Sequence, residues 1–274
     1  MRLCLVLVEG NIGSGKSTLL EHVTEPLRAL LEQAGGNIQL CSVPEPVHRW
    51  QAPGNAAART AERPSLNLLE AAYAQPQRYA FAMQTYAVVT RVDALLHAVA
   101  HSSSSATVLV LLCERSVYSD ACVFARAAFF RGSLSLLEYR VYRDLFTSAV
   151  RVLDARDVAL IVYVDTPPDV CAANMRRRQR REERAVNSGY LSMINTLHAA
   201  RLSDTTTTTT TTPPLPLHAE EEQNIGQWPG GVPVLRVHEH QLMGITADAS
   251  VARERAHDIY QALIASATFR HALE

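Results

Sequence analysis

The stretch GNIGSGKST, residues 10–18, decides the fold of this chain. Its glycines, lysine and serine follow the spacing G-x-x-x-x-G-K-S, which is typical of a loop that cradles phosphates. An apolar run precedes it and an apolar-periodic segment follows it, so the context is strand, loop and helix. Backbone N–H groups of such a loop, and the positive end of the helix behind it, face phosphate oxygens. The pattern predicts a nucleoside triphosphate site, and a glycine-rich turn that binds nothing is the weaker alternative.

Individual roles follow from the same spacing. Lys16 is expected to reach the β- and γ-phosphates, and the Ser17 hydroxyl is expected to ligate Mg²⁺. The residues predicted to bind the nucleotide in this loop are Gly10, Asn11, Ile12, Gly13, Ser14, Gly15, Lys16, Ser17 and Thr18.

Five short apolar runs are separated by long segments of helical character. They cover residues 3–8, 38–43, 107–113, 158–164 and 232–237. Runs this continuous suit strands buried on both faces, and helical crossovers between them imply a five-stranded parallel sheet flanked by helices. With 274 residues, of which 47% are hydrophobic, we expect one α/β domain over residues 1–274. Ligands of such sheets bind at the carboxyl ends of the strands, so residues after each run are site candidates.

Charge and hydrophobicity limit the partners and the cellular compartment expected for this protein. The formal net charge of −1 gives no overall basic field, which argues against nucleic acid as the main partner. No apolar run has transmembrane length, and the first strand leaves no room for a targeting segment ahead of it. We therefore expect a soluble, cytoplasmic protein with no membrane partner, and the nucleus stays open as a compartment.

The cysteines form no C-x-x-C pair and are expected to be buried free thiols; they are Cys4, Cys41, Cys113, Cys122 and Cys171.

One segment, residues 203–222, departs from the alternating pattern. Its eight consecutive threonines and the prolines after them can neither pack a core nor hold a helix. We expect a disordered surface insertion, because loop insertions cost little stability. Binding of a partner is the alternative.

Two carboxylates follow predicted strands. Glu45 lies between Pro44 and Pro46, which fix the backbone on both sides, and such a placement suits a general base or a metal ligand. A capping acid at a helix start is the alternative. Glu114 occupies the place where proteins with this loop keep a second magnesium ligand, and Arg115 follows as a candidate phosphate clamp.

A basic cluster, MRRRQRREER, covers residues 175–184 after the fourth strand. A solvated helix face or a nucleic-acid patch is one interpretation. In a chain of neutral overall charge, a single arginine cluster also suits a lid that closes over a triphosphate. We favour an arginine-rich lid over about residues 174–184.

Four motifs together resemble the deoxyribonucleoside kinase family, that of the deoxycytidine, deoxyguanosine and insect multisubstrate kinases. They are GNIGSGKST, VPEPVHRW from residue 43, YAQPQRYAFAMQTYAVVTR from residue 73 and ERSVYSD from residue 114. The resemblance runs from about residue 3 to about residue 200. It implies a P-loop NTPase fold of the nucleoside kinase type, usually a homodimer. It also implies Mg²⁺-dependent transfer of the γ-phosphate of ATP, or of another NTP, to a nucleoside 5′-hydroxyl.

The resemblance also implies roles for the acids and the lid. Glu45 matches the base that takes the 5′-hydroxyl proton, Glu114 the magnesium-side acid, and Arg115 the phosphate clamp. Both acids lie near the transferred phosphate, so the sequence leaves their division of labour open, and we favour Glu45 as the base. Arg178 and Arg180 match arginines of the lid.

For the nucleoside, the resemblance implies a further set of residues. Tyr73 and Glu183 match the pair that binds the sugar 3′-hydroxyl. Gln84 matches the amide that reads the base edge, with Arg91 and Asp120 beside it. Two aromatic residues complete the pocket: Phe124 would stack on the base, and Trp50 would line the wall.

The chain departs from the family pattern at several positions. Asn174 stands where an arginine is expected early in the lid, and Arg176 and Arg177 lie within one turn of it and could substitute. Ala72 and Met83 replace larger apolar residues, which predicts a wider base pocket. The loop expected to cradle the donor base reads HEHQLMG from residue 238 and leaves donor preference open.

The function expected from the resemblance is ATP-dependent phosphorylation of a deoxyribonucleoside, a salvage reaction. Deoxycytidine and purine deoxynucleosides should be favoured over thymidine, because an amide and a carboxylate suit a base edge that carries an amine. A nucleoside monophosphate kinase and an inactive binding subunit are the alternatives. The short N-terminus and the low-complexity insertion resemble the compact copies carried by large DNA viruses.

Overall fold

The computed structural model describes residues 1–54, 66–151, 157–202 and 228–274. The expected threonine and proline insertion, residues 203–222, lies outside these ranges. Among the residues described, no helix has the length and apolar character to cross a bilayer.

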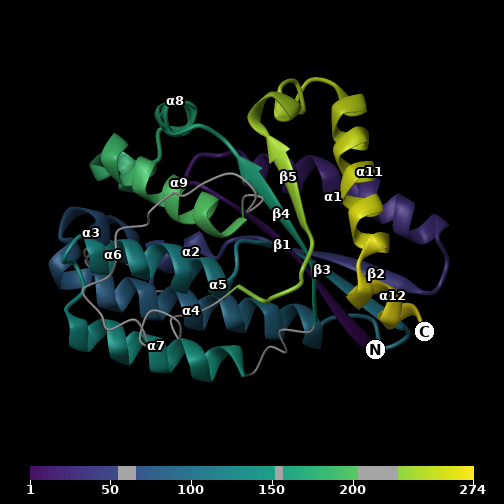
Figure 1. Ribbon diagram of the computed structural model, residues 1–274, viewed down its shortest axis with the longest axis horizontal. Coiled ribbons are helices and arrows are strands. Elements are labelled where there is room, and N and C mark those ends of the chain that lie inside the picture. The colour runs from purple at the N-terminus through teal and green to yellow at the C-terminus, as the bar shows by residue number, and fades with distance from the viewer. Residues whose placement is uncertain (55–65, 152–156, 203–227) are drawn as a thin grey trace.

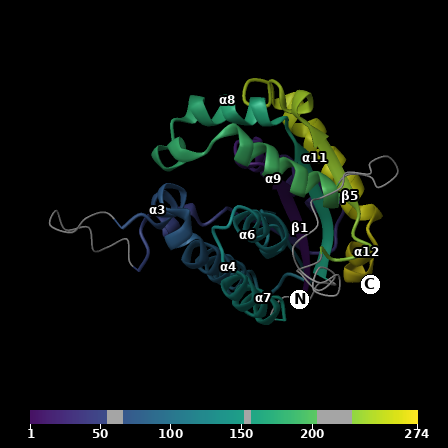
Figure 2. The same cartoon turned by 60° about the vertical axis from the view of Figure 1, so that its left-hand side comes forward.

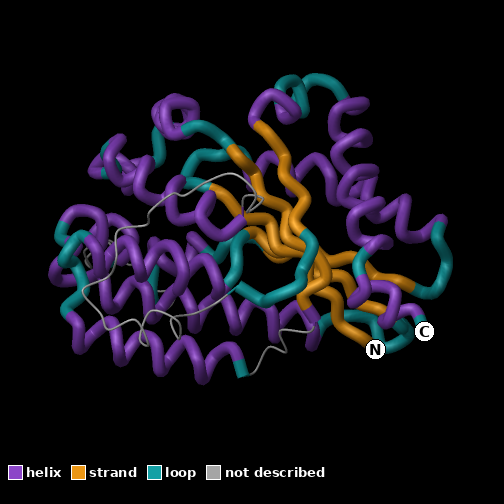
Figure 3. The backbone as a smooth tube through the Cα atoms, viewed as in Figure 1, coloured by secondary structure: helices purple, strands orange, loops and turns teal. Residues whose placement is uncertain are grey.

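The five predicted strands are confirmed, each with bounds within two residues of the apolar run. All neighbouring strands pair in parallel, in the order β2-β3-β1-β4-β5 (Figure 3). The strands are β1 (Arg2–Gly10), β2 (Ile38–Val43), β3 (Val108–Glu114), β4 (Val158–Asp165) and β5 (Val234–His238). β1 lies at the centre of the sheet, so the loop that follows it opens at the middle of the carboxyl edge.

Helices connect the strands and cover both faces of the sheet (Figure 1). In the described ranges, α-helices are α1 (Lys16–Gln33), α2 (Val47–Gln51), α3 (Leu68–Ala74), α4 (Pro76–Ala100), α5 (Val117–Ser119), α6 (Arg126–Phe130), α7 (Leu136–Val150), α8 (Pro168–Arg178), α9 (Ser188–Leu202), α11 (Ala249–Ala265) and α12 (Ala267–Leu273). A π-helix, η2 (Asp120–Ala125), and two 3-10 helices, η4 (Arg181–Ala185) and η5 (Glu239–Leu242), complete the secondary structure there.

The core divides into two layers because alternate side chains of a strand face opposite sides of the sheet. Leu5 and Leu7 of β1 pack with α4 and α7, whereas Val6 and Val8 pack with α1 and α11. This is the doubly covered parallel sheet expected from the continuous apolar runs.

The five cysteines are free thiols, and four of them are buried. Cys41 is half-buried. Burial raises the pKa of Cys4, Cys113 and Cys122 to about 12, with Asp157 adding to the effect at Cys4. The expectation of buried, unpaired thiols is therefore confirmed, apart from the partial exposure of one of them.

Candidate active site

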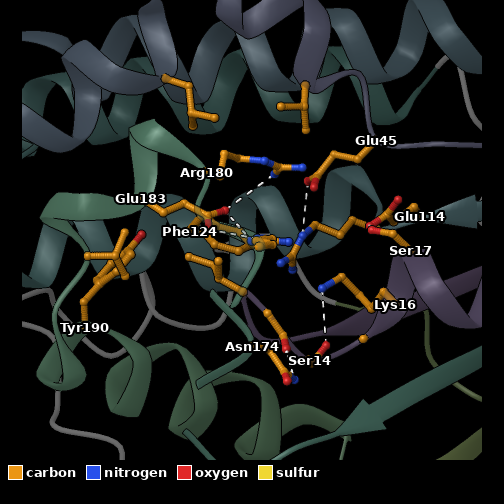
Figure 4. Close-up of a pocket in the computed structure, with 18 of the residues that line it drawn as sticks. Ser14, Lys16, Ser17, Glu45, Glu114, Phe124, Asn174, Arg180, Glu183 and Tyr190 are labelled. Atoms are coloured by element: carbon orange, nitrogen blue, oxygen red, sulfur yellow. Dashed lines mark hydrogen bonds and ion pairs between the residues drawn. The ribbon is translucent and has the colours of Figure 1, made fainter. Parts of the chain in front are cut away.

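A cavity of about 970 Å³ lies at the carboxyl edge of the sheet (Figure 4). Its walls come from the loop after β1, the segments after β2 and β3, the lid and the segment after β5. Most of the residues predicted for the site line this cavity. The predicted residues that do not line it are Gly10, Asn11, Arg91 and Arg176.

Two glycines of the phosphate loop are required by its backbone. Gly10 has φ 146°, and a Cβ there would lie 2.5 Å from the Val164 carbonyl oxygen. Gly13 has φ 76°, and a Cβ there would lie 2.6 Å from the Cys171 carbonyl oxygen. Side chains at these positions would push the loop off β4 and α8, so both glycines are needed for the loop to curl.

Lys16 lies inside the curled loop and is only 4% exposed. Its Nζ donates to the Asn11 carbonyl oxygen at 2.7 Å and to Ser14 Oγ at 3.4 Å. Burial, together with Arg115, lowers the pKa of Lys16 to about 7. A polyphosphate beside the ammonium group would favour its charged form, as expected for a group that binds phosphates.

Ser17 and Glu114 meet at the mouth of the loop, where the Ser17 hydroxyl donates to Glu114 Oε1 at 2.6 Å. A hydroxyl and a carboxylate are the hard oxygen ligands that Mg²⁺ prefers. In the described ranges, no group of three His, Cys, Asp or Glu side chains has metal-binding geometry. The pair therefore fits Mg²⁺ that takes its remaining ligands from phosphates and water, the usual arrangement for this ion.

Glu45 is fixed by two guanidinium groups. Its Oε1 lies 3.1 Å from Arg115 Nε and 3.2 Å from Arg91 Nη2. Burial opposes the charged form, yet Arg115, Arg91 and Lys16 hold the pKa of Glu45 below its ordinary value. The carboxylate is therefore charged at neutral pH and able to accept a proton.

Arg115 has a left-handed backbone, with φ 63°. Its N–H donates to the Val8 carbonyl at 2.9 Å and its Nη1 donates to the Gly10 carbonyl at 2.6 Å. The guanidinium also lies 4.7 Å from the centroid of the Phe124 ring. These contacts lock Arg115 between the end of β1 and Glu45, with its side chain at the cavity wall.

Sequence reasoning missed Glu9, a fully buried acid that follows the apolar residues 3–8 of β1. Ser116 Oγ donates to Glu9 Oε1 at 2.5 Å, and burial raises the pKa of Glu9 to about 7. The bond joins the end of β1 to the segment after β3, next to Arg115. A single acid within a run of buried apolar residues was the signal that could have revealed it.

Two of the predicted base-reading residues, Arg91 and Asp120, form a buried network. Arg91 Nε and Nη2 donate to the two Asp120 carboxylate oxygens at 2.8 and 3.1 Å, and Arg91 Nη1 donates to the Glu114 carbonyl at 2.9 Å. Arg91 therefore lies behind the wall, whereas Asp120 and Gln84 line the cavity. The wide turn of η2 brings Asp120 and Phe124 to the same cavity.

The predicted sugar-binding residues come from two opposite walls. Tyr73 is on α3, and Glu183 is on η4 in the lid. The ring of Tyr73 meets Tyr190 of α9 edge to face, with centroids 6.4 Å apart. Figure 4 shows Glu183 and Tyr190 on one side of the cavity, with Glu45 and Lys16 toward the other. After the ligands expected from the sequence, we name the part of the cavity around Lys16 the phosphate half and the part around Tyr73 and Glu183 the nucleoside half.

The lid arginines differ in what they contact. Arg178 and Arg180 are paired with Glu183, and both line the cavity together with Arg177. Arg176 is exposed and does not line the cavity, so it is poorly placed to substitute for the expected arginine. Asn174 occupies the position where the arginine was expected. Its side chain donates to the Gly13 carbonyl at 2.9 Å and so connects α8 to the phosphate loop.

The segment after β5 lies beside the phosphate loop. Glu239, Leu242, Met243 and Gly244, all from the HEHQLMG stretch, line the cavity. A Cβ on Gly15 would lie 3.3 Å from a methyl carbon of Leu242. The stretch therefore lies beside the phosphate loop, where the sequence places the loop that cradles the donor base.

Comparisons with known proteins show the family of this chain. The family model described as deoxynucleoside kinase matches residues 6–225. Deoxycytidine kinase 2 of Gallus gallus is 31% identical over 211 residues, which cover 75% of this chain and 76% of that protein. A probable deoxycytidine kinase of Fowlpox virus is 30% identical over 199 residues, with 73% and 72% covered. The mitochondrial deoxyguanosine kinase of Xenopus laevis is 28% identical over 211 residues, with 75% and 76% covered.

The match runs from the first strand to beyond α9, and so includes every element that contributes to the nucleoside half of the cavity. The sheet order and the phosphate loop after its central strand are those of a P-loop kinase. This chain therefore belongs to the deoxynucleoside kinase family and is a phosphotransferase.

Proposed function

We propose that this protein transfers the γ-phosphoryl group of ATP to the 5′-hydroxyl of a deoxyribonucleoside in the cytoplasm, with deoxycytidine favoured over thymidine. The observation that carries the proposal is the position of Glu45. Its carboxylate is held by Arg115 and Arg91 and lines a cavity that also contains the phosphate loop and Tyr73. A base at this place can take a proton from a hydroxyl that faces a bound phosphate.

The chain's own residues divide the work of this reaction. Glu45 accepts the proton of the 5′-hydroxyl, because its two arginine partners keep it charged. Lys16 and the lid arginines Arg177, Arg178 and Arg180 oppose the charge that builds up on the transferred group. Ser17 and Glu114 would hold Mg²⁺, which when bound neutralises phosphate charge.

Base selection rests on the network around Asp120. Gln84 offers a donor and an acceptor side by side, which match the N3 acceptor and N4 donor of cytosine. Asp120 adds an acceptor for an exocyclic amine, where thymine presents a carbonyl. A mismatched edge would place a carbonyl against the Asp120 carboxylate and leave the Gln84 amide without its partner, and this cost is the basis of discrimination. Ala72 lines the same cavity, so its small side chain leaves room that purine bases can use.

The double substitution Arg91→Met with Asp120→Ala is expected to raise the kcat/KM of thymidine relative to that of deoxycytidine by about tenfold. It removes the carboxylate that repels the thymine carbonyl. Because Arg91 also contacts Glu45, total turnover should fall at the same time. Steady-state kinetics with both nucleosides measure the ratio. A wild-type enzyme that uses thymidine as efficiently as deoxycytidine would show that these two residues do not set the choice.

We also propose that the protein is a homodimer. Helices α4 and α7 pack side by side (Figure 1), and both expose large apolar side chains. On α7, Leu137, Val141 and Leu145 recur every four residues, with 73%, 42% and 42% exposure; on α4, Val89 and Leu96 are 54% and 47% exposed. Such a stripe on a surface helix pair suits pairing with the same stripe of a second copy.

Replacing both Leu137 and Val141 with glutamate is expected to convert the dimer to a monomer, because the charges would be buried unpaired at the interface. Light scattering after size exclusion measures the mass. Leu273→Glu on α12, at a similarly exposed leucine away from this face, is the matched control and should leave the mass unchanged. A monomeric wild-type protein would contradict the proposal.

A further inference from the structure

Glu182, to which the sequence assigns no role, joins the lid to the opposite wall of the nucleoside cavity. Its Oε1 accepts hydrogen bonds from Gln51 Nε2 and from Asn67 Nδ2, each at 2.8 Å. Gln51 is the last residue of α2 and Asn67 is the N-cap of α3, at 131 and 115 residues from Glu182 along the chain. One carboxylate oxygen thus ties three separate elements together.

The Glu182 carboxylate, which makes these hydrogen bonds, is buried and charged. Glu182 is 7% exposed. Burial opposes its charge, yet hydrogen bonds from its own backbone, Asn67 and Gln51 hold the pKa of Glu182 below its ordinary value. Both amide donors therefore bond to a carboxylate, and such charge-assisted bonds are about twice as strong as neutral ones.

The donors are themselves fixed in place. Asn67 Oδ1 accepts from the Glu70 N–H at 3.0 Å as the cap of α3, which leaves its Nδ2 directed at Glu182. A second contact between the same elements, Arg181 Nε to Glu70 Oε1 at 3.0 Å, lies at the surface. Glu182 is thus the buried member of a small interface between η4 and α3.

The elements that Glu182 joins carry the residues of the nucleoside half. α2 carries Trp50 and α3 carries Tyr73, whereas the lid carries Glu183 next to Glu182 in the chain. Figure 2 shows the segment between α8 and α9 lying next to α3. The width of the cavity between Tyr73 and Glu183 therefore depends on how η4 is attached to α3.

We infer that Glu182 is a positioning residue for the acceptor, which holds Glu183 opposite Tyr73 at the separation that the deoxyribose requires. The inference rests on the proposed function, since it takes a nucleoside as the ligand of this half. Glu182 itself touches neither substrate. Its loss widens the nucleoside half and leaves the phosphate loop, which it does not contact, in place.

The test is calorimetric titration of the full-length protein with deoxycytidine, together with the KM for ATP at saturating deoxycytidine. Glu182→Ala is expected to weaken deoxycytidine binding about tenfold, the usual size of one lost charged hydrogen bond, with the KM for ATP changed less than about twofold. Glu182→Gln should bind deoxycytidine within about threefold of wild type, because its amide oxygen still accepts from both donors.

Two further variants complete the test. Glu70→Ala removes the exposed ion pair of the same interface and is the matched control, with an expected change below about twofold. Gln51→Ala combined with Asn67→Ser, which keeps a good cap on α3, should reproduce Glu182→Ala, and adding Glu182→Ala to it should cause no further loss.

Unchanged deoxycytidine binding in Glu182→Ala overturns the inference, and so does an equal loss for deoxycytidine and ATP, which would indicate general destabilisation. Failure of the proposed function is recognised in the wild-type protein alone. The wild type would then bind deoxycytidine without phosphorylating it, or would bind no deoxynucleoside.

Discussion

Replacing Lys16 with alanine is expected to lower turnover by about a thousandfold, the effect of removing a preorganised group from a developing charge. In the free protein Lys16 donates to Asn11 and Ser14, both in its own loop, so the substitution removes little that holds the fold together. Rates in a coupled assay and the melting temperature measure the two effects. Activity within threefold of wild type would contradict the assignment of the phosphate loop.

Lys16→Arg is a sharper control for the same position. Lys16 is the single lysine among the 274 residues of this chain. Arginine keeps the positive charge but is larger and planar, and the site leaves the lysine only 4% exposed. We expect the arginine variant to be inactive as well, which would show that the loop requires the compact ammonium group as well as a positive charge.

Glu45→Gln is expected to lower kcat by about 10² to 10⁴ while nucleoside binding persists, because glutamine keeps the shape but accepts no proton. Glu114→Gln is the matched comparison. If Glu114→Gln lowered kcat this much with nucleoside binding intact and Glu45→Gln did not, the division of roles would be reversed.

The pH dependence follows from the arginine partners of Glu45. Arg115 and Arg91 hold the pKa of Glu45 below 4.5, the ordinary value for a glutamate, so this carboxylate keeps its charge as the pH falls toward 4.5. Turnover should therefore stay constant down to about pH 5. Removing Arg91 raises the pKa of Glu45, so Arg91→Met alone should lose activity at a higher pH than wild type. Adding Asp120→Ala removes a negative charge that repels Glu45 and should partly reverse this shift.

The sheet and the main site residues could be predicted because their signals are local. Each strand is marked by a short, mainly apolar run, and Glu45 and Glu114 lie within two residues of the end of such a run. The lid residues that line the cavity were harder to predict, because a run of arginines does not show which of them face the cavity once the helix forms. On α8, Asn174, Arg177 and Arg178 share one face at spacings of three and four residues, and Arg176 points elsewhere.

Other features depend on contacts between distant segments. Arg91 contacts Asp120, Glu45 and the Glu114 carbonyl, from 29, 46 and 23 residues away, so one guanidinium joins the residue proposed to read the base to the proposed general base. Glu182 is one acid in a charged stretch and gives no local sign of its two amide partners. Such contacts form only when the chain folds, and the spacing of apolar residues along the sequence does not predict them.

Central to this account is the transfer of phosphate to a nucleoside 5′-oxygen. The direct test is incubation of wild-type protein with Mg²⁺, deoxycytidine and ATP labelled at the γ-phosphate, followed by identification of the labelled product. We predict label in deoxycytidine 5′-monophosphate, with Glu45→Gln forming little of it. Label recovered only as inorganic phosphate, or transfer only when deoxycytidine 5′-monophosphate replaces deoxycytidine as the acceptor, would contradict the account.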